Sequence, residues 1–159
     1  MSLLLWITGA AGAGKSTLAQ ALLRRWPQAQ PPLWLDGDRW RAILGPLGEG
    51  YTPPDRLAIG SALARLALEL VAQGRPVMVS TISRHAQVGE LLDEHRGAQL
   101  RVRLRAPLAE LRARRPQIDA SELAAMDADP WPFRVDLQLA PAAVADWVER
   151  VLARLDGTL

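Results

Sequence analysis

One lysine stands apart in a chain whose other Lys/Arg positions are all arginine. Lysine and arginine together number 19 among 159 residues, and Lys15 is the single lysine. It lies in "GAAGAGKST", which fits the pattern G-x-x-x-x-G-K-[ST]. Glycines in this pattern let successive backbone N–H groups point at an anion, and the lysine reaches the outer phosphates as a compact charge that a wide arginine fork cannot replace. The spacing therefore predicts a phosphate-binding loop for a nucleotide, with contacts from Gly9, Ala10, Ala11, Gly12, Ala13, Gly14, Lys15, Ser16 and Thr17.

A second chemical stretch, "LDGDRWR", places two carboxylates after an apolar run. At the end of a strand beside a phosphate loop, Asp36 or Asp38 could orient a magnesium ion or accept the proton of an acceptor hydroxyl. Arg41 follows Asp38 by about one helical turn and could hold an anionic substrate by a bidentate contact. An Asp-Gly turn with one aspartate capping the next helix would leave the same residues, so both interpretations stay open.

These residues need a scaffold, and the hydrophobic pattern predicts one of alternating strands and helices. Apolar runs predict strands over 2–8, 31–36, 75–81, 99–105 and 134–140. Helical spacing and end signals predict helices over 15–26, 39–44, 55–73, 84–96, 107–115 and 141–155, with loops at 45–54 and an irregular stretch at 116–132. This alternation predicts an α/β fold with a five-stranded parallel sheet between helical layers, and a ligand at the carboxyl ends of the strands.

Length and composition limit the classes of protein. A chain of 159 residues with no linker or repeat predicts one domain over 1–159. A net charge of +2 gives no nucleic-acid footprint, and the absence of cysteine excludes disulfides and thiolate metal sites. The apolar start is too short for a membrane span and lacks a basic leader, so no membrane role and a cytoplasmic location are expected. The sequence permits a homodimer.

Four motifs together resemble one family of phosphate-loop kinases. "GAAGAGKSTLA", "LDGDRWR", "YTPPDR" and "VSTISRH" have the order and approximate spacing of the adenylylsulfate kinases over about residues 3–115, and "DPWPF" at 129–133 is a looser match. The resemblance implies a three-layer α/β/α kinase fold, ATP with Mg²⁺ at 9–17, and a lid-like segment at about 115–132. It implies a magnesium or base role for Asp38 with Asp36 beside it, and magnesium also at Ser16. Implied catalytic residues are Lys15, Asp38, Asp36 and Ser83, and implied substrate contacts are Asp38, Arg41, Tyr51, Arg56, Ser80, Thr81 and Ile82.

The chain departs from this family at positions where the family binds its acceptor. Ile59 and Ala62 stand where the family has an asparagine and an arginine. The lysine-rich lid of the family is replaced by a segment carrying Asp119, Glu122, Asp127 and Asp129, which would remove positive field from the acceptor side. The sequence thus predicts a kinase that transfers the γ-phosphoryl group of ATP to a hydroxyl, with adenylylsulfate as first candidate. A related kinase for another hydroxyl compound and a non-catalytic nucleotide-binding module are the alternatives.

Two further residues, Arg114 and His85, each have two explanations. Arg114 ends the helix over 107–115, where it either complements the helix dipole or clamps the nucleotide phosphates as part of the lid. His85 follows a strand end near the expected site, yet a solvated helix start explains a lone histidine as well. Trp131 lies in the irregular stretch, whereas Trp6 and Trp34 fall on strands and are expected in the core.

Overall fold

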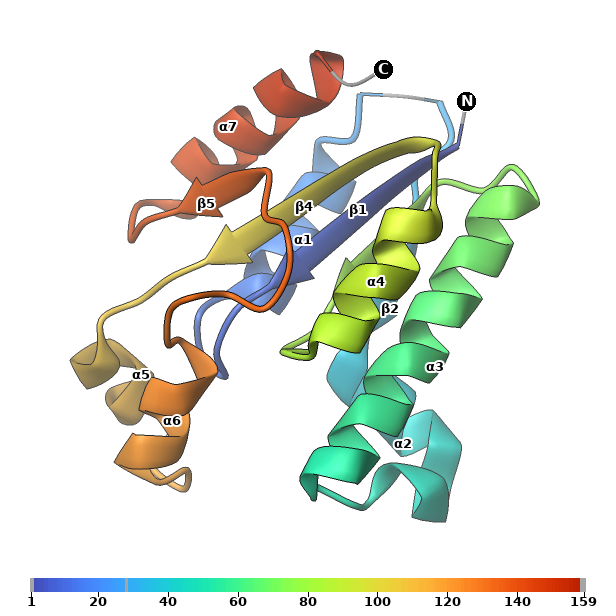
Figure 1. Cartoon of the computed structure of the whole chain (residues 1–159). Coiled ribbons are helices and arrows are strands. Elements are labelled where there is room, and N and C mark those ends of the chain that lie inside the picture. Colours follow the sequence, from blue (N-terminus) through green and yellow to red (C-terminus); the bar gives the residue numbers. More distant parts are fainter. Residues whose placement is uncertain (1, 28, 158–159) are drawn as a thin grey trace.

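The computed structural model describes residues 2–27 and 29–157, and within them five strands form one parallel sheet in the order β2-β3-β1-β4-β5 (Figure 1). The strands are β1 (Leu3–Thr8), β2 (Leu33–Asp36), β3 (Val77–Ser80), β4 (Ala98–Leu104) and β5 (Leu137–Leu139). The predicted parallel sheet and the strand assignments are confirmed. The central strand β1 is apolar and buried along its length, as expected of a strand covered on both faces.

Helices cover both faces of the sheet and separate its core into two clusters. On one face, α1 (Lys15–Arg24) and α7 (Val144–Asp156) pack against Leu3, Leu5 and Ile7 of β1. On the other face, α3 (Pro53–Ala72) and α4 (Ala86–Glu94) pack against Leu4 and Trp6. Successive residues of β1 thus face opposite layers, which gives the predicted α/β/α architecture.

The order of the strands brings three carboxyl ends to one edge of the sheet. β1 lies between β3 and β4, and β2 pairs with β3 so that Asp36 lies opposite Ser80. The chain turns from β2 directly into α2 (Gly37–Leu44), and the short 3-10 helix η1 (Gly45–Gly48) follows within the stretch predicted as a loop. The phosphate loop, the end of β2 and the end of β3 therefore meet, as the pattern predicts.

The prediction of an irregular segment at 116–132 is wrong in part. After α5 (Leu108–Arg114), a second short helix, α6 (Ala120–Met126), begins at Asp119, whose side chain accepts a hydrogen bond from the Ser121 amide. Leu123 and Met126 are buried against the core. The sequence "DASE" has an N-cap residue followed three positions later by a glutamate, and this signal was available to sequence reasoning. Figure 1 shows α5 and α6 side by side at the end of the sheet where β1 and β4 finish.

Candidate active site

A cleft of about 1270 Å³ lies at the carboxyl edge of the sheet. Its floor is the phosphate loop, and its walls come from α2, α3, the segment after β3, and the α5–α6 segment. Most of the residues singled out from the sequence line it, namely Ala11, Gly12, Gly14, Lys15, Ser16, Thr17, Asp36, Asp38, Arg41, Tyr51, Arg56, Ser80, Thr81, Ile82, Ser83 and Arg114.

The phosphate loop has the backbone that its glycines permit. Gly9 and Gly14 have φ values of 148° and 101°, and a Cβ on Gly9 would lie 2.5 Å from the Leu104 carbonyl oxygen. Any side chain there would collide with the β4 backbone, so these positions require glycine. The side chains of Ala10 and Ala13 are fully buried in the core, so these two residues can face a ligand only through their backbone.

Lys15 begins α1 with its ammonium group folded back over the loop. Its Nζ donates a hydrogen bond to the Ala10 carbonyl at 2.8 Å. Burial lowers the pKa of Lys15 to about 8, although the nearby Asp38 carboxylate opposes the shift. A half-buried ammonium without a full counter-charge is poised to gain from a bound phosphate, since the phosphate supplies the negative charge that the site lacks.

Asp36 is fully engaged with its neighbours. One carboxylate oxygen accepts from the hydroxyls of Ser16 and Ser80, both at 2.8 Å. The other accepts from the amides of Asp38 and Arg39 and so caps α2. Burial by itself raises the pKa of Asp36, but these hydrogen bonds outweigh burial and hold the pKa below its usual value. Asp36 thus ties the phosphate loop to β2 and β3, and its helix-capping role, one of two sequence interpretations, is present.

Asp38 contrasts with Asp36. It lines the cleft in the first turn of α2, close enough to Lys15 to oppose the shift in that lysine's pKa. Within residues 2–27 and 29–157 its carboxylate accepts no hydrogen bond and forms no ion pair. The structure therefore separates the two carboxylates that sequence reasoning left equal: Asp36 holds the scaffold, and Asp38 faces the cleft.

Two arginines and a tyrosine form the far wall of the cleft. The Arg41 guanidinium lies 4.4 Å from the centre of the Tyr51 ring and donates to the carbonyls of Gly48 and Gly50, both at 2.8 Å. Arg56 donates through Nε to the Tyr51 carbonyl. Its Nη2 lies 2.6 Å from a carboxylate oxygen of Glu122 on α6. One of the two predicted anion-binding arginines is therefore already paired with a lid carboxylate.

The segment after β3 supplies hydroxyl groups to the same cleft. The Ser80 side chain is buried and held by Asp36 and by the Trp34 indole N–H at 2.9 Å. Beyond it, the hydroxyls of Thr81 and Ser83 lie 3.2 Å apart. Gly60 of α3 leaves room for this turn, since a Cβ there would lie 2.7 Å from the Ser83 Oγ. Ser83 thus lines the cleft beside Gly60 of α3.

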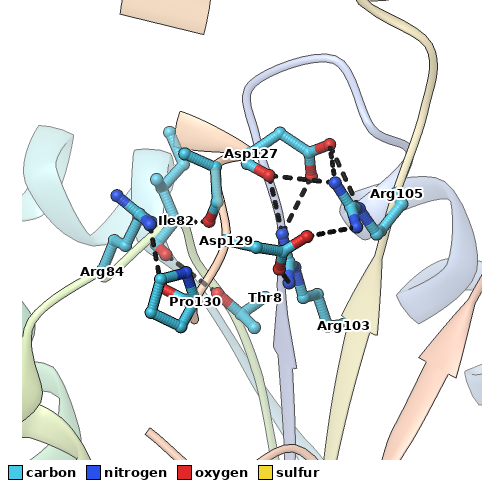
Figure 2. Close-up of polar contacts among 9 residues, drawn as sticks. Thr8, Ile82, Arg84, Arg103, Arg105, Asp127, Asp129 and Pro130 are labelled. Atoms are coloured by element: carbon cyan, nitrogen blue, oxygen red, sulfur yellow. Dashed lines mark hydrogen bonds and ion pairs between the residues drawn. The ribbon is translucent and has the colours of Figure 1, made fainter. Parts of the chain in front are cut away.

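The acidic residues of the segment predicted to be lid-like do not act as the sequence suggested. Asp127 and Asp129 are bound by Arg103 and Arg105 of the β4 end (Figure 2), and neither lines the cleft. Asp119 caps α6 and also lies off the cleft lining. The expectation of a broadly acidic acceptor wall is wrong, because the carboxylates at 127 and 129 are neutralised by arginines; Glu122 lines the cleft and is paired with Arg56.

Arg114 reaches the phosphate loop. Its Nη1 donates to the Gly12 carbonyl at 2.9 Å, and its Nη2 pairs with Glu110 one turn earlier. This contact joins the start of the lid segment to the nucleotide side of the cleft.

One of two further cleft residues, Trp147, was missed by sequence reasoning, and the other, His85, was left undecided by it. Trp147 of α7 packs beneath the loop, with a ring atom 3.1 Å from where a Gly14 Cβ would lie, and no local motif marks it. His85, whose role the sequence left undecided, lines the cleft. Burial together with the Arg56 charge lowers the pKa of His85.

Comparison with known proteins decides the family. The family model described as adenylylsulphate kinase matches residues 1–119. The chain belongs to the adenylylsulfate kinase family. It is 36% identical over 115 residues to the adenylyl-sulfate kinase of Myxococcus xanthus, covering 70% of this chain and 62% of that protein. It is 37% identical over 86 residues to the cytidine diphosphoramidate kinase of Campylobacter jejuni, covering 54% of this chain and 49% of that protein.

The fold extends the similarity beyond the matched segment. The Mycobacterium tuberculosis APS kinase CysC, solved in complex with AMPPNP and APS, superposes with a TM-score of 0.79 at 25% identity, and the match covers 98% of each chain. The chain spans less than two thirds of the length of both curated relatives named above. Among the described residues, no helix is long and apolar enough to cross a membrane.

Proposed function

We propose that this protein is a kinase that transfers the γ-phosphoryl group of ATP to the hydroxyl of a small anionic acceptor. The observation that carries the proposal is the arrangement of the cleft: Lys15 and the phosphate loop form its floor, and the free carboxylate of Asp38 lies beside them. Arg41 and Arg56 lie on the opposite wall, about where an acceptor anion would be bound. The comparisons support this assignment, because relatives in the family carry kinase names.

In this proposal the cleft residues divide the chemistry of transfer, and Asp38 has two candidate roles, as the base or as a ligand of the magnesium ion. As the base, Asp38 accepts the proton of the acceptor hydroxyl, whose oxygen attacks the γ-phosphorus as the bond to the bridging oxygen of ADP breaks. Lys15, the loop N–H groups and Arg114 share the charge that develops on the transferred phosphoryl oxygens. Arg41 and Arg56 hold the acceptor, and Ser83 lies beside it. Residues 1–159 act as one domain, with the segment at about 115–132 as its lid.

A magnesium ion fits the residues present. Mg²⁺ with a nucleotide usually keeps several waters and takes one or two protein oxygens, so the absence of an acidic cluster in residues 2–27 and 29–157 agrees with it. The Ser16 hydroxyl and the Asp38 carboxylate both line the cleft, and Asp36 holds Ser16 in place. When bound there, the ion would neutralise charge on the phosphates.

Adenylylsulfate is the first candidate acceptor, and a different hydroxyl compound is the second. The second is favoured by Ile59 and Ala62 at two expected contact positions, and by the engagement of Arg56 with Glu122. The similarity to a cytidine diphosphoramidate kinase also supports it, since that relative bears the name of another acceptor. The two candidates share an anionic group that Arg41 and Arg56 would bind.

The proposal is tested by measuring ADP release from purified protein with saturating ATP and Mg²⁺ against a panel of hydroxyl acceptors. Adenylylsulfate, nucleoside diphosphates and simple sugar acids form the panel. Acceptor-dependent ADP release with any member supports a kinase, and the kcat/KM values rank the acceptors. Tight ATP binding without transfer to any acceptor would instead favour a non-catalytic module.

Glu122→Gln is expected to lower KM for the best anionic acceptor by two- to fivefold. The variant frees Arg56 from a carboxylate that competes with the acceptor anion, and the effect is small because partly exposed ion pairs are worth less than about 1 kcal/mol. Initial rates at varied acceptor concentration measure it. Glu110→Gln is the matched control, because Glu110 pairs with Arg114 on the nucleotide side and its loss should leave acceptor KM unchanged. A higher KM in Glu122→Gln would mean that Glu122 itself contacts the acceptor.

A further inference from the structure

A cluster of ion pairs fastens the end of the lid segment to the sheet. We call Arg103, Arg105, Asp127 and Asp129 the anchor cluster (Figure 2). Asp129 receives Arg103 Nη1 at 2.6 Å and Arg105 Nη1 at 2.7 Å. Asp127 receives Arg105 Nη2 at 3.1 Å, and its carbonyl accepts from Arg103 Nη2 at 2.7 Å. Arg103 and Arg105, at alternate positions at the end of β4, thus hold the chain just after α6.

Because Arg103 is buried, it depends on its partners in the segment after α6. Its side chain is 2% exposed, and a buried cation is costly unless carboxylates and carbonyls surround it. In addition, the Arg103 guanidinium lies 4.5 Å from the centre of the Trp131 ring. The segment at 127–129 therefore cannot shift along β4 unless the buried Arg103 guanidinium loses its partners.

A second contact ties the same segment to the acceptor side of the cleft. Arg84 donates to the carbonyls of Ala128 and Pro130 at 2.6 and 3.2 Å, and its guanidinium lies 5.3 Å from the Trp131 ring. Arg84 directly follows Ser83, and the Ile82 carbonyl accepts from the Thr8 hydroxyl at the end of β1. Figure 2 shows Arg84 beside Pro130, and Thr8 beside Ile82.

The held segment fixes a wall of the cleft. α6 ends at Met126, one residue before Asp127, and contributes Glu122, Ala125 and Met126 to the cleft lining. We propose that Asp127 and Asp129, gripped by Arg103 and Arg105, are positioning residues that set the α6 wall of the acceptor site relative to Ser83 and Arg56. The kinetic part of this inference rests on the proposed function, whereas its structural part does not.

The chain contains a matched control for a purely structural role. Arg101 lies two residues before Arg103 on β4, is fully buried, and pairs with Asp93 of α4 at 2.8 Å. Asp93 and Asp129 have side chains of the same exposed fraction, 57%. Asp93 lies outside the lid and does not line the cleft. Asp129→Asn and Asp93→Asn therefore remove the same kind of partner from two buried arginines of one strand.

The test compares these two variants with the natural protein in amide hydrogen exchange and in kinetics. In Asp129→Asn we expect exchange of the α6 amides to speed up about tenfold and acceptor KM to rise about tenfold, with KM for ATP unchanged. Hydrolysis of ATP without acceptor should rise relative to transfer, because a displaced wall admits water. Asp93→Asn should change the melting temperature by a similar amount. It should leave α6 amide exchange, acceptor KM and the ratio of ATP hydrolysis to transfer unchanged.

Two outcomes overturn the inference. The first is equal α6 exchange in both variants, and the second is a rise of acceptor KM in Asp93→Asn to the level of Asp129→Asn. If the natural protein transfers phosphate to no acceptor, the proposed function fails and exchange alone decides: faster α6 exchange in Asp129→Asn than in Asp93→Asn still supports the anchor. A second variant, Asp127→Asn, guards against misfolding, since it removes the Arg105 contact while leaving the backbone carbonyl that Arg103 uses.

Discussion

Replacing Lys15 by methionine is expected to lower kcat for phosphoryl transfer by about a thousandfold. The ammonium group lies over the loop and donates to the Ala10 carbonyl, and removing one preorganised donor from a developing oxyanion costs about a hundred- to a thousandfold. Steady-state ADP release with saturating acceptor measures the loss. Arg24→Met is the control, because Arg24 is an exposed cation in the last turn of the same helix and should leave kcat unchanged.

Lys15→Arg tests whether charge alone is enough. The Lys15 Nζ fits 2.8 Å from the Ala10 carbonyl, where a planar guanidinium is too broad to sit without opening the loop. We expect this variant to fold and to lose most of its turnover. Activity within a few-fold of the natural protein would show that the loop tolerates the larger cation.

The lowered pKa of Lys15 also predicts a pH dependence of stability without ligand. Between the folded pKa of about 8 and the unfolded value of 10.5, the folded chain has released this proton while the unfolded chain still holds it. The unfolded state then binds more protons, so the free energy of unfolding rises with pH across this window, by up to about 3 kcal/mol in total. Denaturant titrations of the natural protein and Lys15→Met at pH 7 and pH 10.5 would show the rise in the former alone. ATP affinity should fall above pH 8, as the neutral amine no longer attracts phosphate.

The fold and the floor of the site follow from local sequence signals. Buried strands such as Leu3–Thr8 are continuous apolar runs, and the phosphate loop depends on a backbone geometry that its glycines allow. Both features can therefore be recognised from a short stretch of sequence. The three strand ends meet because parallel strands joined by helices present their carboxyl ends on one edge. Sequence reasoning succeeded where one segment determines the outcome.

The lid could not be predicted in the same way, because its charges depend on distant partners. Asp127 and Asp129 look like acidic surface residues in the sequence, yet their partners Arg103 and Arg105 lie more than twenty positions earlier, at the end of β4. Counting the charges over 119–129 therefore predicted the wrong electrostatic field on the acceptor side of the cleft. Trp147 escaped for the same reason, since only the packing of α7 under Gly14 brings it to the loop.

The division of labour between the two aspartates gives the other large effect. Asp38→Asn is expected to lower kcat by about a hundred- to ten-thousandfold while KM for ATP changes by less than threefold, because the carboxylate faces the cleft and holds no part of the scaffold. Its melting temperature should stay close to that of the natural protein. Stopped assays for ADP and phosphorylated acceptor, together with thermal unfolding, measure both quantities.

Asp36→Asn should behave differently. An amide cannot accept from both serine hydroxyls with one oxygen while the other oxygen caps α2, so its NH₂ group would face a donor. Each charged hydrogen bond lost costs about 1.5 to 3 kcal/mol, and we expect a clear drop in melting temperature together with weaker ATP binding through Ser16. Equal losses of stability in the two variants would contradict the separation of their roles.

The dependence of the Asp38→Asn rate on Mg²⁺ then assigns the role of Asp38. A ligand of the ion raises the Mg²⁺ concentration needed for half-maximal rate when it is replaced, and excess Mg²⁺ recovers part of the loss. A base leaves that concentration unchanged and gives a loss that excess Mg²⁺ does not recover. Because Asp38 is free of hydrogen bonds within the described chain, it can serve either role, and the recovery by Mg²⁺ decides between them. An unchanged kcat in Asp38→Asn would exclude both roles and leave Asp38 as a residue of the turn.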